Sequence, residues 1–443
     1  MTQDWLWMTA ADLGRAIGAG KIDPVALTET YLGAIQAHGL RDRIYARLTE
    51  DRALAEATAA AGRAKSGRRR GVLDGVPISW KDLFDTAGVV TEAGTALLKG
   101  RTPDRDALVL RNATAVGLVC LGKTHMSELA FSGLGYNPVT ATPPSASDPD
   151  GVAGGSSSGA AASVAQGLAA AGIGSDTGGS VRVPSVWNDL VGLKTTSGLL
   201  SLQGVVPLAE RFDTVGPLCR SVEDAALMLA ALGGGAIPDL HGASLKGVRL
   251  AILQTLAMDD LDDAPAKGFA TAVEKLRDAG AIIEEIDVPE VAEANGMSAL
   301  LLATEAYGTW KHLIEDQPDL MFHEIRERFR VGGSFTGADF VAGWQRLDAL
   351  RHAYLQKTAG YDAVILPTSP ILPPKIAKLA SDSTYYKDVN LLTLRNTRIG
   401  NLMGLAALTL PTGVPATGLM LQTPANTEAR LLRLGAAAEA ALA

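Results

Sequence analysis

The spacing of apolar residues changes from helical to strand-like in the N-terminal part of the chain. Over residues 24–38 apolar side chains recur every three or four positions, after the capping residue Asp23, which predicts a helix. A second, alanine-rich helix is expected at about residues 50–64. From Val76 apolar and polar positions alternate, which predicts a strand that ends at Lys81. Lys81 is therefore expected on the strand face opposite the apolar side chains.

Helix-like and strand-like segments then alternate. Residues 107–116 have helical spacing and precede an apolar run at 118–121, and residues 158–168 precede another at 169–174. This alternation is typical of an α/β fold, in which helices cover both faces of a large mixed central sheet. Ser221 caps a further helix, and the same two kinds of spacing return at 248–253, 264–279, 282–286, 363–366, 405–410 and 427–441.

The composition excludes several classes of protein. With 47% hydrophobic and 20% charged residues, the 443-residue chain is expected to be globular rather than disordered. A net charge of −8 offers no general attraction for phosphate backbones, so no nucleic-acid partner is expected. No basic segment with an apolar core opens the chain, and no apolar run reaches the roughly 18 residues of a membrane span. We therefore expect a cytoplasmic location and no membrane contact.

Cysteine and histidine spacing gives no sign of a metal centre. The two cysteines, Cys120 and Cys219, lie far apart and outside any CxxC motif, so they are expected to be buried, inert thiols. No His, Cys and carboxylate cluster has ligand spacing, so neither a metal nor another cofactor is expected. The one basic cluster, residues 65–70, is interpreted as a solvated loop.

Two glycine-rich segments each deliver a serine. Residues 154–159 are Gly-Gly-Ser-Ser-Ser-Gly, and residues 176–182 are Asp-Thr-Gly-Gly-Ser-Val-Arg. Consecutive glycines let backbone N–H groups converge on a ligand, because no Cβ blocks the approach. Ser180 would have such donors beside it, and Ser156 is a second hydroxyl that can pass protons on. The pair predicts acyl-transfer chemistry.

A serine nucleophile needs a base, and the sequence favours a lysine. The six histidines form no paired motif, and His125, the one nearest the glycine-rich segments, is interpreted mainly as a packing residue. Lys81 stands at the end of a core strand, where burial would lower its pKa and favour the neutral amine. Ser157 formally completes a G-x-S-x-G motif, but Pro149 and the neighbouring glycines leave no strand before it.

The separations from Lys81 to Ser156 and from Ser156 to Ser180, with the surrounding motifs, resemble the amidase signature family of serine hydrolases. The resemblance rests on residues 75–82, 154–194 and 212–218, and more weakly on 410–413. It covers most of the chain apart from residues 240–390. It implies an amidase-signature fold and a Ser-cisSer-Lys triad.

Carried over to this chain, the resemblance assigns Lys81 as the base, Ser156 as the middle serine after a cis peptide, and Ser180 as the nucleophile. It implies an oxyanion hole and a supporting shell around these groups. The backbone N–H groups of the hole come from Thr177, Gly178, Gly179 and Ser180, and the supporting residues are Ser157, Asp176 and Arg182.

The sequence gives fewer signals for the residues of the substrate pocket than for the catalytic groups. The resemblance places Ala130, Phe131 and Gly155 in substrate binding. From the segment 240–390, Tyr307, Trp310 and Phe322 are equally compatible with the pocket and with the core. The chain departs from the family pattern at residues 187–189 and 194–196, and residues 141–149 lack an arginine common in the family, which puts the packing of the catalytic loop in question.

The chain is therefore expected to form one amidase domain over residues 1–443, because no repeat or linker divides it. Its segments would be a helical N-terminal layer (1–65), the catalytic core (66–235), a substrate-shaping insertion (240–390) and a return to the core (391–443).

The leading hypothesis is a cofactor-free amidase that cleaves the C–N bond of a small aryl or short aliphatic carboxamide, with carbamates or esters as side substrates. Two alternatives stay open: a glutaminase subunit of a tRNA-dependent amidotransferase, and a catalytically silent binding protein. Besides the small-molecule amide, a homodimer partner is left open.

Overall fold

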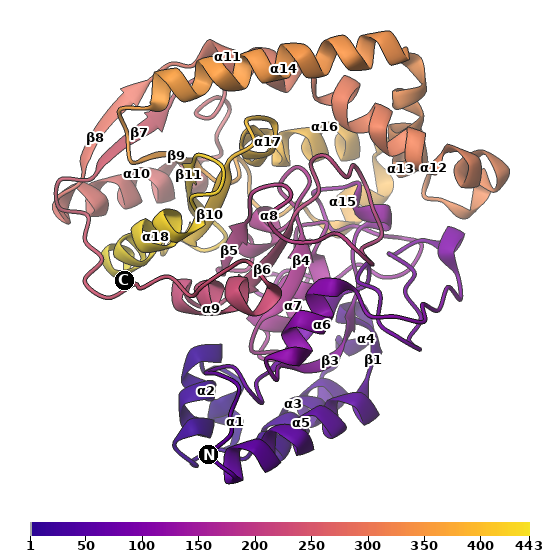
Figure 1. Cartoon of the computed structure of the whole chain (residues 1–443). Coiled ribbons are helices and arrows are strands. Elements are labelled where there is room, and N and C mark those ends of the chain that lie inside the picture. The colour runs from indigo at the N-terminus through magenta and orange to yellow at the C-terminus, as the bar shows by residue number, and fades with distance from the viewer. Residues whose placement is uncertain (1) are drawn as a thin grey trace.

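The computed structural model describes residues 2–443 and is built on one mixed sheet of 11 strands (Figure 1). Along the sheet the strand order is β1-β3-β2-β4-β6-β5-β10-β11-β9-β7-β8. The strands are β1 (Tyr45–Leu48), β2 (Pro77–Lys81), β3 (Val119–Thr124), β4 (Gly172–Ser175), β5 (Val191–Lys194), β6 (Val215–Cys219), β7 (Arg249–Leu253), β8 (Ile282–Ile286), β9 (Ala363–Pro367), β10 (Ala406–Pro411) and β11 (Gly418–Thr423).

Helices cover both faces of this sheet, with α8 and α9 on either side of its middle strands in Figure 1. The first nine are α1 (Thr2–Trp5), α2 (Ala10–Gly18), α3 (Pro24–Ala37), α4 (Arg41–Ile44), α5 (Glu50–Lys65), α6 (Leu108–Ala115), α7 (Ser158–Ala165), α8 (Arg182–Val186) and α9 (Val222–Leu232). The others are α10 (Asp263–Asp278), α11 (Pro289–Gly296), α12 (Thr304–Asp316), α13 (His323–Arg330), α14 (Gly337–Thr358), α15 (Ile376–Ser381), α16 (Ser383–Thr393), α17 (Arg395–Leu402) and α18 (Glu428–Leu442).

The α/β prediction is confirmed, and the local signals that predicted the elements are visible in the structure. The Asp23 carboxylate accepts the N–H groups of Val25 and Ala26 at the start of α3, and the Ser221 side chain caps α9 in the same way. Parallel pairs such as β2 with β3 and β7 with β8 are joined through helices, because a parallel connection must cross over the sheet.

Strand β2 differs from an amphipathic strand because both of its faces are covered. All five of its residues are buried, so the polar side chains of Ser79 and Lys81 lie inside the protein together with Ile78 and Trp80. Lys81 therefore faces an enclosed interior rather than solvent.

The segment 240–390 contributes to the same sheet rather than lying apart from it. Strands β7, β8 and β9 form one edge, and β9 pairs with β11 from the C-terminal segment. The helices α11 and α14 of this segment run across the top of the molecule in Figure 1. In residues 2–443 no helix is long and apolar enough to cross a membrane.

Close backbone packing at the middle of the sheet gives a stability prediction. A Cβ added at Gly216 would lie 1.9 Å from the carbonyl oxygen of Leu193, so strands β6 and β5 would have to separate. We expect Gly216→Ala to lower the free energy of unfolding by about 1–3 kcal/mol, the usual cost of overpacking, measured by denaturant titration. Gly33→Ala in α3, where a Cβ meets nothing within 4 Å, is the control and should be neutral or stabilising. Equal stability of the two variants would show that β5 and β6 tolerate a side chain between them.

Candidate active site

Lys81 lies at the end of β2, fully buried, and its amine contacts two serines. The Nζ atom donates to Ser156 Oγ at 2.6 Å and to Ser175 Oγ at 2.8 Å. Burial lowers the pKa of Lys81 to about 7, although the charges of Asp213 and Asp176 raise it in part. A large fraction of this amine is therefore neutral at neutral pH and able to accept a proton.

Ser156 and Ser157 occupy a tightly enclosed turn before α7. The peptide bond from Gly155 to Ser156 is cis, as the resemblance implied. Ser157 is completely buried and its Oγ donates to the carbonyl oxygen of Ser175 at 3.3 Å, so it does not present a hydroxyl to a substrate. A side chain at Gly155 would lie 2.5 Å from Ser127 Oγ, which shows that this glycine is needed for packing.

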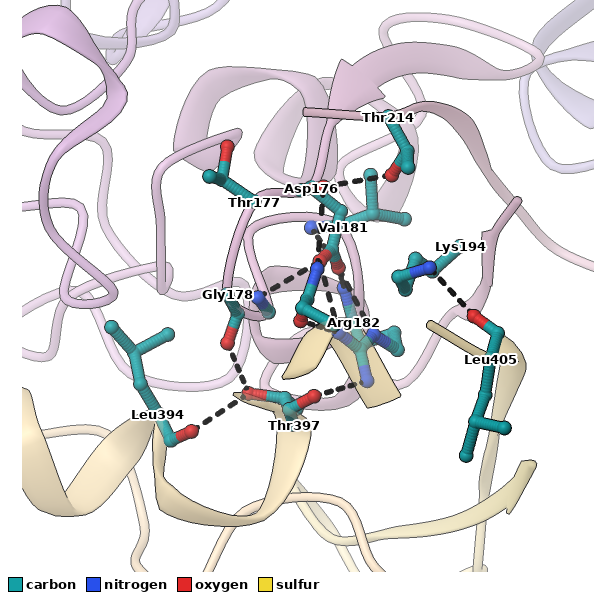
Figure 2. Close-up of polar contacts among 12 residues, drawn as sticks. Asp176, Thr177, Gly178, Val181, Arg182, Lys194, Thr214, Leu394, Thr397 and Leu405 are labelled. Atoms are coloured by element: carbon teal, nitrogen blue, oxygen red, sulfur yellow. Dashed lines mark hydrogen bonds and ion pairs between the residues drawn. The ribbon is translucent and has the colours of Figure 1, made fainter. Parts of the chain in front are cut away.

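A buried ion pair holds the loop that carries Ser180 (Figure 2). The Asp176 carboxylate accepts bonds from Arg182 Nε and Nη2 at 3.0 and 2.9 Å, and from the N–H groups of Gly179 and Val181 at 2.9 and 3.1 Å. Both charged side chains are fully buried. Burial raises the pKa of Asp176, but the charge and hydrogen bonds of Arg182 lower it by more, and the carboxyl stays ionised.

Helix α17 fixes the same loop from the opposite side. Figure 2 shows that Arg182 Nη1 donates to the Thr397 carbonyl oxygen at 2.6 Å and that Thr397 Oγ1 donates to the Gly178 carbonyl oxygen at 2.8 Å. Arg182 Nη2 also donates to Asn401 Oδ1 at 2.6 Å. Gly179 has φ +138°, and a Cβ there would lie 2.0 Å from Thr397 Oγ1. No other residue fits this position without moving α17.

The loop leaves three amide groups unpaired. In residues 2–443, the backbone N–H groups of Thr177, Gly178 and Ser180 donate to no other protein group, whereas that of Gly179 is bonded to Asp176. This differs from the expectation that all four amides face a substrate, because the Asp176 carboxylate uses the third to hold the turn. The Ser180 hydroxyl also has no partner within these residues.

Ser180 lies on the wall of a cavity. Its walls include the predicted pocket residues Ala130 and Phe131, but not Gly155. The remaining wall residues are Ser132, Thr177, Gly178, Leu208, Leu302, Arg328, Leu394 and Arg398.

The aromatic residues considered for the pocket lie elsewhere. Trp310 is buried and its indole N–H donates to the Pro207 carbonyl oxygen at 2.9 Å. Phe322 packs edge-on against Tyr136, and Tyr307 donates to Glu315 on an exposed surface. Trp310, Phe322 and Tyr307 therefore pack within or on the protein rather than lining the cavity beside Ser180.

Asn188, one of the residues that departs from the family pattern, is held by three hydrogen bonds. Asn188 Nδ2 donates to the carbonyl oxygens of Ala153 and Pro184, both at 2.8 Å, and its Oδ1 accepts the Ala146 N–H at 2.9 Å. This one side chain ties the segment 141–149 to α8. The residue that departs from the family pattern at position 188 therefore has all of these polar atoms hydrogen-bonded within the protein.

Sequence reasoning missed several groups that shape the site. Ser175 binds Lys81, and Asp213 accepts a hydrogen bond from Thr177 Oγ1 at 2.5 Å. The other missed residues lie on α13 and α17 and are Arg328, Thr397, Arg398 and Asn401. The one sequence signal for α17 was the mainly polar segment 395–401 in front of an apolar strand.

His125 is not part of the hydrogen-bonded arrangement around Lys81 in residues 2–443. Burial lowers the pKa of His125, and in the described part of the chain its ring is hydrogen-bonded to neither Ser156 nor Ser180. No group of three or more His, Cys, Asp or Glu residues in residues 2–443 is placed to hold a metal ion. Cys120 and Cys219 are free and buried, as predicted.

Comparison with known proteins agrees with this geometry. A family model described as Amidase matches residues 26–432. The chain belongs to the amidase family. It is 34% identical over 453 residues to a 2-amino-5-chloromuconic acid deaminase of Comamonas testosteroni, with 98% of this chain and 97% of that protein covered.

Two further matches place this amidase among well-known relatives. It is 32% identical to the A subunit of the glutamyl-tRNA(Gln) amidotransferase of Chloroflexus aurantiacus, with 97% of this chain and 95% of that protein covered. A crystal structure described as an amidase superposes with a TM-score of 0.88 at 31% identity and covers 98% of this chain and 100% of its own. The protein is an amide hydrolase of this family, and the predicted amidase-signature fold is confirmed.

The Asp176–Arg182 pair gives a prediction for this amidase. We expect Asp176→Asn to lower the free energy of unfolding by about 3–5 kcal/mol, because it leaves the Arg182 guanidinium buried without a counter-charge. Denaturant titration checks this. Glu274→Gln, which breaks the exposed pair with Arg277, should change stability by less than about 1 kcal/mol. A similarly small effect of Asp176→Asn would show that the pair does not hold the loop.

Proposed function

We propose that this amidase hydrolyses a small carboxamide through an acyl-enzyme on Ser180, with Ser156 and Lys81 as the proton relay. The observation that carries the proposal is the 2.6 Å hydrogen bond between the buried Lys81 amine and Ser156 Oγ, next to a cavity wall that presents Ser180. The N–H of Ser157 donates to the carbonyl oxygen of Ser180 at 3.2 Å, which keeps the two serine loops in contact.

The proposed acylation step uses these three side chains in turn. Neutral Lys81 accepts the proton of Ser156 as Ser156 Oγ takes the proton of Ser180, and Ser180 Oγ attacks the amide carbon. The carbonyl oxygen becomes an oxyanion, which the unpaired N–H groups of Thr177, Gly178 and Ser180 stabilise. Such donors contribute about 3–4 kcal/mol each to lowering the barrier in enzymes where they have been removed singly.

Collapse of the intermediate breaks the C–N bond. Ser156 gives its proton to the leaving nitrogen and is reprotonated by Lys81, so the product leaves as ammonia or a neutral amine. A water molecule then loses a proton through the same relay and attacks the acyl carbon, which releases the acid and restores Ser180. Protonation of the leaving nitrogen is essential for amide cleavage, because an amine anion is a poor leaving group. Esters and carbamates contain related carbonyl groups and are expected side substrates.

A glutaminase subunit of a tRNA-dependent amidotransferase is the second candidate. The similarity to the A subunit of a glutamyl-tRNA(Gln) amidotransferase supports it. A chain of that kind would copurify with partner subunits and depend on glutamine, whereas a free-standing amidase would turn over simple amides alone. The similarity to a 2-amino-5-chloromuconic acid deaminase supports ammonia as a product in either case.

The nucleophile can be tested directly. We expect Ser180→Ala to lower amidase activity at least 1,000-fold, as about 10³–10⁶-fold losses are usual for an enzymatic nucleophile, with an unchanged melting temperature because no core volume is lost. A fluorophosphonate should label Ser180 in the wild type, located by peptide mass spectrometry. Ser157→Ala is the matched control for labelling. Loss of the label in Ser157→Ala but not in Ser180→Ala would overturn the assignment.

The base gives a pH prediction. Only neutral Lys81 accepts a proton, so kcat/KM should rise with pH through about 7 and then level off, measured from pH 5 to 10. Lys81→Arg should be inactive toward amides, because a guanidinium stays protonated. Near-normal activity of Lys81→Arg, or a pH profile that changes only in His125→Ala, would identify a different base.

A further inference from the structure

Two arginines from distant parts of the chain line the cavity next to Ser180. Arg328 lies on α13, within the segment 240–390, and Arg398 lies on α17. Both belong to the walls around Ser180 and to those of an adjoining cavity of about 420 Å³. The two guanidinium groups therefore stand where the acyl chain of a substrate bound at Ser180 would extend.

Neither arginine has a carboxylate partner in residues 2–443. Arg398 is 5% exposed, and its one side-chain hydrogen bond runs from Nη1 to Asn295 Oδ1 at 3.3 Å, while Nη2 is buried without a partner. Arg328 lies over the Phe131 ring at 4.4 Å, and its Nη1 is also buried without a partner. Each thus keeps an unused buried donor.

The neighbouring arginines on α13 behave differently. Arg326 and Arg330 both donate to Glu327, at 3.0 and 2.9 Å. The acidic side chains of the larger cavity are thereby occupied, since Glu324 is likewise paired with Lys387 at 3.2 Å and accepts the Ser383 hydroxyl. In the described residues neither Glu324 nor Glu327 forms an ion pair with Arg328 or Arg398.

This arrangement is unfavourable unless an anion binds. Burial lowers the pKa of Arg328 to about 10, and burial together with the charge of Arg328 lowers that of Arg398 to about 9, so both remain cationic at neutral pH. Leaving a charged donor buried and unpaired is costly, and a planar carboxylate with two oxygens matches guanidinium donors. A purely apolar acyl group would leave that cost in place.

We propose that Arg328 and Arg398 form a carboxylate-binding subsite, so that the preferred substrate is the half-amide of a dicarboxylic acid. The inference rests on the proposed function, because Ser180 defines where the amide carbonyl binds. Phe131 and Leu302 line both cavities and would contact the carbon chain between the amide and the carboxylate. The free carboxylate then determines which amides are turned over efficiently.

A substrate pair differing in one charge tests the subsite. For the wild type we expect kcat/KM for succinamate to exceed that for the neutral diamide succinamide by at least about 100-fold, since sites built to bind a polar group reject analogues that lack it. The same comparison of glutaramate and malonamate with their diamides identifies the chain length with the largest preference. Equal kcat/KM for acid and diamide at every length would overturn the proposal.

Substitutions of the two arginines test whether they cause this preference for the acid. Arg398→Met and Arg328→Met should each reduce the acid-to-diamide preference at least 10-fold, mainly through KM. Arg326→Met, which removes a guanidinium from the same helix but not from a cavity wall, should leave the preference unchanged. A preference that persists in both cavity variants would place the carboxylate elsewhere and overturn the assignment.

A binding measurement on a variant that lacks the Ser180 hydroxyl tests the subsite separately from the proposed function. Calorimetry on Ser180→Ala should show succinamate binding at least 10-fold more tightly than succinamide, whereas equal binding would contradict the subsite. Fluorophosphonate labelling of Ser180 in the wild type reports the nucleophile independently. Selective binding without labelling would support the subsite and refute Ser180 as the nucleophile. Labelling without selective binding would support the nucleophile and refute the subsite.

Discussion

The buried pair of Asp176 and Arg182 organises the site. Arg182 neutralises the carboxylate, which in turn accepts two backbone amides of the Ser180 loop, and the remaining arginine donors extend to α17. Removing either partner would leave an uncompensated buried charge. Because the pair spans the loop and α17, the positions of the nucleophile and of the cavity wall depend on one interaction.

The same pair has an electrostatic consequence for Lys81. Asp176 and Asp213 are the anions that favour a charged Lys81, yet Asp176 is matched by Arg182, and burial raises the pKa of Asp213. Desolvation of the amine therefore outweighs attraction to these carboxylates. In the proposed relay, a lysine that would be cationic on the surface therefore acts as the base, with no histidine involved.

Short segments of the sequence predicted much of this arrangement. Lys81 follows a strand pattern, and the serines stand in glycine-rich turns, so their chemistry can be inferred from local sequence. The contacts of Thr397 with Gly178, and of Arg328 with Phe131, join residues about 200 apart. Only the folded chain brings these together, and polar residues such as Asn401 give no local sign that they are buried.

Different segments of the chain contribute the serine loops and the cavity wall. In the proposed mechanism, segments 75–82 and 154–194 supply the reacting groups, while α13 and α17 contribute to the cavity wall beside Ser180. The strands of segment 240–390 extend the same sheet, and α13 of this segment contributes Arg328 to the wall beside Ser180. Substitutions on α13 can therefore change the cavity wall without altering the contacts that hold the Ser180 loop, whereas Thr397 on α17 belongs to those contacts.

The neutrality of Lys81 near neutral pH is the property on which the proton relay depends. Nuclear magnetic resonance titration of ¹³C- and ¹⁵N-labelled lysine side chains, with the Lys81 signal assigned by its loss in Lys81→Met, measures this property without reference to any substrate. We expect a Lys81 pKa of about 7, while the exposed lysines titrate near their usual value of about 10.4. A Lys81 signal that stays that of an ammonium up to pH ~10 would contradict the assignment of this residue as the base.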